Sequence, residues 1–222
     1  MNSDLFLKLD LHVHTIYSYD GLITPKELIW QLKKKGLDGV AITDHDTIKG
    51  WPKFKRALNK HGFIVIPGIE VSAKNAHILA LNVKTLIPAQ LEINETIDLI
   101  HEAGGIAVAA HSVAIYRGWT KNLSRKFDAI EVINASSFPF YFSALFAKRL
   151  AAKLELPQVA GSDAHYYREV GWAYTIVKVD DHSLDNVLKA IEKGTIIPYG
   201  KPIPLHIRLK REALTLKRKL GQ

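Results

Sequence analysis

Two histidines near the start of the chain have the spacing of a metal-binding pair. His12 and His14 follow the apolar residues 5–7 in a segment that we expect to be extended, so both side chains point to the same face of the strand. Imidazole nitrogen is the commonest protein ligand for zinc and similar transition metals. A histidine-rich strand end without a metal is the alternative, and the pair alone does not decide between them.

More histidines and acids lie at the ends of other short apolar runs, which are typical of buried strands. Together with the first pair they form a set of nine candidate metal ligands: His12, His14, Asp20, His45, Glu70, His77, His111, Asp163 and His165. One zinc-like ion takes about four ligands, so nine predict two or three divalent ions. The chain has no cysteine, and histidine-rich sites favour Zn, Mn or Fe over Mg or Ca.

Strand-like and helix-like segments alternate along most of the chain. Thr24-Pro25 predicts the start of a helix and Gly36 its end, while Gly104-Gly105 ends a helix over 89–103. Such alternation is typical of a parallel sheet with crossover helices. Because polar residues follow nearly every strand, we expect an α/β fold that is a slightly irregular TIM-like barrel, about one unit short of eight, with the metal site at the C-terminal ends of the strands. An open doubly wound sheet would gather its ligands at one crevice.

His77 is the exception to this order, because it precedes the apolar residues 78–81. In a parallel strand, a residue at the beginning lies at the end of the barrel opposite to the predicted site. We therefore expect this segment to reverse its direction or to enter from a loop.

Length and composition predict one globular barrel in the cytoplasm. The chain has 222 residues, of which 47% are hydrophobic, enough for a sizeable core. No apolar run approaches the roughly 20 residues of a membrane span, and the start lacks a signal pattern. We therefore expect a cytoplasmic protein with no membrane association.

The positive charge is concentrated at the C-terminus. From Lys201 onward seven Lys or Arg face one acid, so +6 of the net +8 lies in the last 22 residues. We expect residues 1–200 to form the barrel and residues 201–222 to form a basic amphipathic helix packed on it by an apolar face, which consists of Leu205, Leu209, Ala213, Leu216 and Leu220. The opposite face is expected either to be merely solvated or to contact nucleic acid.

Five motifs carry most of the candidate ligands: Asp10-Leu-His12-Val-His14-Thr15, Thr43-Asp44-His45-Asp46, Gly68-Ile-Glu70, Ala110-His111-Ser112 and Gly161-Ser-Asp163-Ala-His165. Together they resemble the PHP family (polymerase and histidinol phosphatase) of metal-dependent phosphoesterases. The resemblance implies the distorted (β/α)7 barrel and three ion sites. One ion would take His12, His14, Glu70 and Asp163, a second Glu70, His77 and His111, and a third Asp20, His45 and His165.

The resemblance also implies a mechanism in which a metal-bridging hydroxide attacks phosphorus in line, so that no protein nucleophile is needed. Asp44 and Asp46 would orient His45 from behind, as carboxylates often do for metal-bound imidazoles; alternatively, either is the N-cap of the next helix. The chain departs from the family at Ser112, where the family usually has proline. Only 33 residues separate His77 from His111, where related members often carry a long insertion.

Three residues are candidates for substrate binding. Arg117 could grip a phosphate with two hydrogen bonds, although a solvated loop arginine is the alternative. Tyr17 could stack on a base or pack on the barrel rim, and Asn134 ends a predicted strand over 129–134. The aromatic residues 138–142 could form a floor for a nucleobase or belong to the core.

These features predict a hydrolase acting on phosphoric ester bonds, either a phosphatase or an exonuclease-like phosphodiesterase, with a nucleotide or an oligonucleotide end as substrate. A phosphatase for histidinol phosphate is one alternative. Another is a non-catalytic nucleic-acid-binding scaffold that resembles the barrel-type protein subunits of RNase P. The retained candidate ligands argue against the scaffold, whereas the basic tail would suit it.

Overall fold

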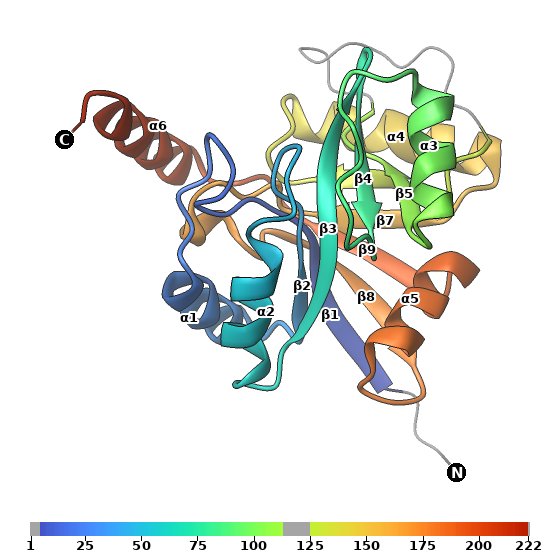
Figure 1. Ribbon diagram of the computed structural model, residues 1–222, viewed down its shortest axis with the longest axis horizontal. Coiled ribbons are helices and arrows are strands. Elements are labelled where there is room, and N and C mark those ends of the chain that lie inside the picture. Colours follow the sequence, from blue (N-terminus) through green and yellow to red (C-terminus); the bar gives the residue numbers. More distant parts are fainter. Residues whose placement is uncertain (1–4, 113–124, 222) are drawn as a thin grey trace.

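The computed structural model describes residues 5–112 and 125–221, which form one strongly curved sheet with helices on its outside (Figure 1). The strands of the described residues are β1 (Leu5–Val13), β2 (Gly39–Ile42), β3 (Ile64–Ala73), β4 (Ala76–Leu81), β5 (Ile106–Ala109), β6 (Ala129–Asn134), β7 (Gln158–Gly161), β8 (Ala173–Val179) and β9 (Ile196–Gly200). The helices are α1 (Pro25–Lys35), α2 (Trp51–Asn59), α3 (Ile93–Glu102), α4 (Phe140–Leu154), α5 (Leu184–Lys193) and α6 (Leu205–Lys219). None of these helices is both long and apolar enough to cross a membrane.

The sheet curves into a nearly closed barrel, as predicted. Its strands follow the order β7-β6-β5-β4-β3-β2-β1-β8-β9. Beyond the end of β7 the chain meets β1, where the Asp163 N–H donates to the His12 carbonyl and the His14 N–H to the Ala164 carbonyl, both at 2.9 Å. The barrel therefore closes at the two segments that carry the first and last candidate ligand motifs.

The strands are less uniformly parallel than a (β/α)7 barrel would be. β4 pairs antiparallel with both β3 and β5, and β8 pairs antiparallel with β1 and β9. The cause at β4 is a tight turn from β3 in which Asn75 adopts a positive φ of 61°, a conformation that asparagine tolerates better than most residues. This turn confirms the reversal predicted from the position of His77, which consequently lies at the same end of the barrel as the ends of the parallel strands.

Local signals at α1 agree with the predicted boundaries. Thr24 and Glu27 form a capping box at its start, and Gly36 ends it with a φ of 61°, a left-handed conformation that glycine adopts without steric cost. The predicted helix over 89–103 is shorter than expected, since α3 begins at Ile93. These helices return the chain to the next strand and thereby set the spacing of the candidate ligands around the barrel.

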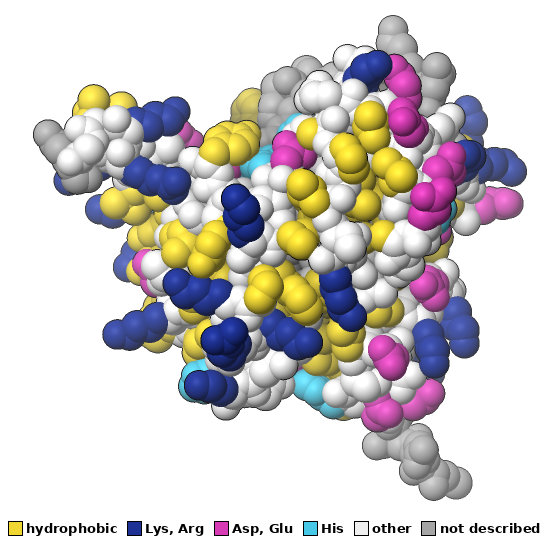
Figure 2. Space-filling view, viewed as in Figure 1, with side chains coloured by type: hydrophobic (Ala, Val, Ile, Leu, Met, Phe, Trp, Pro, Cys, Tyr) yellow, Lys and Arg dark blue, Asp and Glu magenta, His cyan; other side chains and the backbone are white. Residues whose placement is uncertain are grey.

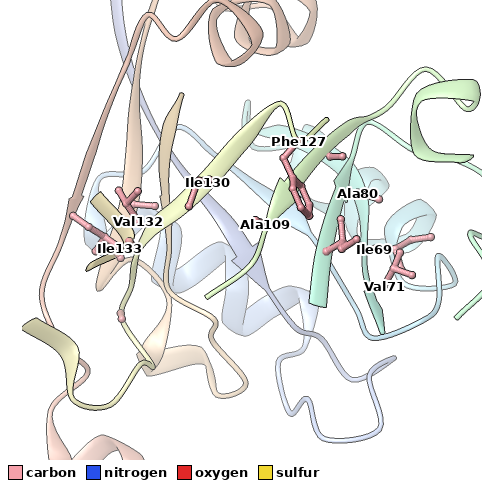
Figure 3. Close-up of a cluster of buried hydrophobic side chains, with 14 of the residues drawn as sticks. Ile69, Val71, Ala80, Ala109, Phe127, Ile130, Val132 and Ile133 are labelled. Carbon is pink, nitrogen blue, oxygen red and sulfur yellow. The ribbon is translucent and has the colours of Figure 1, made fainter. Parts of the chain in front are cut away.

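Alternating residues of a strand point to opposite faces of the sheet, and β4 accordingly contributes to two of the three apolar clusters that the described residues bury. Leu79 and Leu81 of β4 join side chains from β1 to β8 and from α5, inside the curved sheet. Ile78 and Ala80 point the other way, into a cluster with Ile69, Val71 and Phe127 that packs under the outer helices (Figure 3). Complete burial of a large aliphatic side chain stabilises the fold by about 1.5–3 kcal/mol.

The C-terminal helix α6 contacts the barrel through a different face from the one predicted. The four leucines of the predicted face are exposed, with 58–70% of their surface accessible: Leu205, Leu209, Leu216 and Leu220. Leu214, which lies outside that face, is partly buried against the core. The contact is made instead by buried Ile207 and by Arg208, which donates to the carbonyls of Ala135 and Ser136 beyond the end of β6. The prediction that the leucine face docks is wrong, because these carbonyls require hydrogen-bond donors that leucine cannot supply.

Candidate metal centre

The nine candidate ligands, which come from seven segments of the chain, converge at the end of the barrel where the parallel strands stop. His12 and His14 lie at the end of β1, and their Nε2 atoms are 3.1 Å apart. Both Nε2 atoms also lie near one carboxylate oxygen of Asp163, at 3.5 Å for His12 and 3.4 Å for His14. The expected extended geometry of the His12–His14 pair therefore brings both imidazoles to one point.

Glu70 occupies the middle of the cluster. Its Oε2 atom lies 3.1 Å from Nε2 of His12 and 3.0 Å from Nε2 of His14. Its Oε1 atom lies 2.7 Å from Nδ1 of His77 and 2.9 Å from Nε2 of His111. One fully buried carboxylate thus faces two groups of imidazoles, one on each oxygen.

A third group lies around Asp20 in the loop after β1. Its Oδ2 atom is 3.1 Å from Nε2 of His165 and 3.6 Å from Nε2 of His45. The Asp20 side chain is 29% exposed, whereas those of Glu70 and Asp163 are 0% and 2% exposed. The cluster is therefore accessible at Asp20 and, to the same extent, at His77, whose side chain is also 29% exposed.

The imidazoles and carboxylates strongly perturb one another's protonation. Burial acts to lower the pKa of His12, but nearby carboxylates, chiefly Glu131 and Glu70, outweigh it and hold that pKa well above its usual value. His14 reaches a pKa of about 9, because Asp163 and Glu70 likewise outweigh burial. Burial would raise the pKa of Glu70 and of Asp163, yet the surrounding histidines lower both. The imidazole nitrogens that hold protons so tightly, and the carboxylates that stay ionised beside them, present the lone pairs that bind cations.

The donor set fits divalent metal ions. Within the described part of the chain, Asp163 Oδ1, His45 Nδ1 and Asp20 Oδ1 are buried without a hydrogen-bond partner, which is costly unless something else satisfies them. Donors His12, His14, Glu70 and Asp163 lie within 4.8 Å of one another. The two histidines lie 3.0–3.5 Å from each other and from the two carboxylates, close to the edge of about 3.3 Å of a tetrahedron with Zn–N bonds of 2.0–2.1 Å. In two further groups the donor atoms also lie within 4.8 Å of one another: His14, Asp20, His45 and His165, and His45, Glu70 and His77.

Glu131 is a functional candidate that the sequence reasoning missed. It lies on β6 and is 2% exposed. Its Oε1 is 3.0 Å from Nδ1 of His12, while its Oε2 accepts the backbone N–H of His111 and an amide hydrogen of Asn134. A carboxylate inside an otherwise apolar strand was the signal, because a buried charge needs partners. Glu131 orients His12 so that Nε2 faces Glu70.

Asp44 and Asp46 have contacts other than those predicted. Asp44 accepts the backbone N–H of Thr15 at 2.6 Å and its hydroxyl at 2.8 Å, which holds the loop that follows His14. Asp46 accepts the backbone N–H of Ser72. Neither acid caps α2, whose N-cap is Gly50. Both therefore support backbone segments of the site.

The substrate candidates are distributed differently. Tyr17 is partly buried, and its ring packs edge-on against Phe54 of α2, as in the rim-packing alternative. Asn134 donates to the carboxylates of Glu131 and Asp163, so its amide holds groups of the cluster. Arg117 lies outside the described residues. Of the aromatic residues 138–142, Phe140 is buried, whereas Phe138 is 69% exposed.

Two cavities flank the cluster. One of about 350 Å³ lies between Asp20 and His165 on one side and α6 on the other, where Arg208 and Arg211 line it together with Phe138. The second, of about 490 Å³, is lined by His77 and His111 among others. The cluster thus has space for a ligand on both sides.

Comparison with known proteins assigns residues 10–215 to the PHP domain. A protein of Methanocaldococcus jannaschii is 35% identical over 144 residues, which are 58% of this chain and 82% of that protein. The 5'-3' exoribonuclease Rnm of Salmonella typhimurium is 37% identical over 86 residues, 36% of this chain and 29% of the enzyme. A solved two-domain protein of Bacteroides vulgatus, described as containing a predicted PHP-like metal-dependent phosphoesterase, matches with a TM-score of 0.77 and 19% identity over 89% of this chain and 66% of its own.

Proposed function

The chain belongs to the PHP domain family and is a metal-dependent hydrolase of phosphoester bonds, and we propose that its substrates are nucleotides or oligonucleotide ends. One observation supports this proposal above the others: nine histidine and carboxylate side chains from distant segments meet at one end of the barrel. The name of the exoribonuclease relative supports a nucleic-acid substrate, although the matched segment is less than a third of that enzyme.

We propose that His12, His14, Glu70 and Asp163 hold a first ion. A second ion is assigned to Glu70 with His77 and His111, and a third to Asp20 with His45 and His165; Zn, Mn or Fe suits such donors. Divalent ions supply polarisation of phosphoryl oxygens and a lowered pKa for water. The protein positions the donors: Glu131 fixes the ring of His12, and Asn134 fixes the carboxylate of Asp163.

We propose that Arg211 binds a phosphate of the substrate in the cavity beside α6. Its guanidinium donates two hydrogen bonds to exposed Glu212, and buried Glu169 lies 3.4 Å from its Nη1 atom. Glu169 also accepts the backbone N–H of His165. Glu169 therefore contacts both His165 and Arg211, two residues that line the cavity from opposite sides. Arginine suits this role because its planar guanidinium can make paired hydrogen bonds to phosphate. Phe138, exposed at the same cavity, offers a ring on which a base can stack.

The organisation of the chain is part of the proposal. We propose that residues 1–200 form the catalytic barrel and that residues 201–222 form an appended helix which supplies Arg211 to the cavity. The matched family region extends to residue 215 and so includes most of α6. We also propose a cytoplasmic location.

The test combines elemental analysis of the purified protein with a hydrolysis panel in the presence of manganese or zinc. The panel contains nucleotides, short single-stranded oligonucleotides, histidinol phosphate and a chromogenic phosphodiester. We expect stoichiometric metal and hydrolysis of nucleotides or oligonucleotides, and loss of both in a His12→Ala, His14→Ala variant that keeps its circular dichroism spectrum. Preference for histidinol phosphate would replace the proposed substrate, and a metal-free protein inactive on every compound would favour the scaffold alternative.

A further inference from the structure

Helices α1 and α2 and their flanking turns present a strongly basic surface. Figure 2 shows Lys and Arg side chains spread over the part of the molecule that α1 and α2 form in Figure 1. Residues 21–62 carry nine cations, of which all except half-buried Lys35 are exposed: Lys26, Lys33, Lys34, Lys35, Lys49, Lys53, Lys55, Arg56 and Lys60. So many like charges on one face repel one another, so the stability of the fold does not explain them.

The four carboxylates of this segment do not offset these charges at the surface. Asp44 is buried, and Glu27 closes the capping box of α1. Asp38 and Asp46 each accept a backbone N–H from a neighbouring strand, and neither is exposed. The outer surface of α1 and α2 therefore carries uncompensated positive charge.

Acidic residues gather instead on another part of the barrel. Figure 2 shows them over the region of α3 and α5, where exposed acids include Glu95 and Glu102 of α3 and Asp185 and Glu192 of α5. The net charge of residues 1–200 is therefore small, although positive and negative side chains lie on different parts of the barrel surface. A polyanion approaching the molecule is directed toward α1 and α2.

Aromatic rings lie between the cations of the basic surface. Trp30 of α1 is 49% exposed, and the Lys34 ammonium lies 4.6 Å from its ring centre. On α2, the Lys55 ammonium lies 4.9 Å from the Trp51 ring. Trp51 is partly buried, so Trp30 is the more accessible of the two rings. Positive charge beside an accessible ring is typical of surfaces that bind single-stranded nucleic acid, since unpaired bases stack on rings while cations contact phosphates.

The basic surface is continuous with the candidate metal centre. The Lys53 ammonium lies 5.9 Å from the ring of Tyr17, which belongs to the loop that carries Asp20. On the other side of this loop, Arg218 in the last turn of α6 donates to the Gly21 carbonyl. The basic turn Lys217–Lys219 therefore extends the surface from the start of α1 toward the cavity beside α6.

We propose that this basic surface binds the phosphate backbone of a single-stranded nucleic acid whose end lies in the candidate metal centre. The basic surface consists of the outer faces of α1 and α2 and the last turn of α6. The inference rests on the proposed function for the identity of the cleaved end. It goes beyond that function in assigning a contact with nucleotides away from the reacting bond. A substrate longer than one nucleotide is therefore bound more tightly than a mononucleotide.

The test is a binding measurement without turnover on the full chain. A fluorescent single strand of about 20 nucleotides is titrated in EDTA at several salt concentrations. We expect binding that weakens steeply with salt, and we expect the Lys53→Glu, Lys55→Glu variant to bind at least about tenfold more weakly. The salt slope should fall by about 1.4, which is about 0.7 for each of two lost phosphate contacts on a single strand. The matched control is Lys189→Glu, Lys193→Glu on α5, which makes the same change of net charge at exposed positions and should stay within about twofold of the unsubstituted protein.

Equal losses in the two variants would overturn the proposal, because they would show only a dependence on net charge. The proposal would also be overturned if the unsubstituted protein did not bind the oligonucleotide, whether or not it binds vesicles of phosphatidylglycerol. Thermal melting of each variant shows whether it is folded, and a poorly folded variant is replaced by Lys53→Gln, Lys55→Gln. This measurement involves no hydrolysis. It therefore tests binding even if the protein hydrolyses no nucleotide, and the hydrolysis panel tests the activity even if the basic surface does not bind nucleic acid.

Discussion

The Glu131 carboxylate lies 3.0 Å from Nδ1 of His12, and Nε2 of the same ring lies 3.1 Å from Glu70. A buried acid on β6 thus holds one side of an imidazole whose other side faces the candidate ions. Such a partner fixes the tautomer and orientation of the ring. The position of Glu131 therefore controls how well the cluster can bind metal.

We predict that Glu131→Gln weakens metal binding by about 10–100-fold while the protein stays folded. The amide keeps the size of the side chain but removes the charge that fixes the His12 ring. Competition with a coloured chelator measures the affinity. Glu102→Gln, at an exposed position of α3, is the control, and an unchanged affinity in Glu131→Gln would contradict the positioning role.

Arg211→Gln is expected to raise KM with little change in kcat. Loss of a charge-assisted hydrogen bond to phosphate costs about 1.5–3 kcal/mol, which corresponds to an increase in KM of about 10–150-fold. Steady-state kinetics on a nucleotide substrate measures both constants. Lys210→Gln, an exposed neighbour on α6, should leave both constants unchanged, and a fall in kcat alone for Arg211→Gln would exclude a role in ground-state binding.

The docking face of α6 predicts two different effects on stability. Ile207→Ala should destabilise the protein by about 2–4 kcal/mol or detach the helix, because Ile207 is 8% exposed within a core cluster. Leu209→Ser, Leu216→Ser should change the free energy of unfolding by no more than about 0.5 kcal/mol per site, since both side chains are largely exposed. Urea unfolding compares the variants. A large decrease in the free energy of unfolding of the leucine variant would show that the leucine face is covered in solution.

Sequence alone predicted which histidines and acids lie together at one end of the barrel, and the reason is chemical. Metal ions accept few kinds of side chain, and parallel strands deliver the residues that follow them to one end of a barrel. The spacing of His12 and His14 sufficed to place both rings on one face, because a strand has a fixed period of two. The reversed strand that carries His77 could also be anticipated, since only that direction brings this histidine to the same end.

Tertiary structure decided what depends on contacts between distant segments. The roles of Glu131 and Asp44 follow from backbone and ring nitrogens supplied by other strands, which no local pattern specifies. The docking face of α6 was set by unsatisfied carbonyls beyond β6 rather than by the leucine period. The basic surface likewise emerged only in three dimensions, because its cations come from helices whose charges are balanced in the sequence by acids on the far side of the barrel.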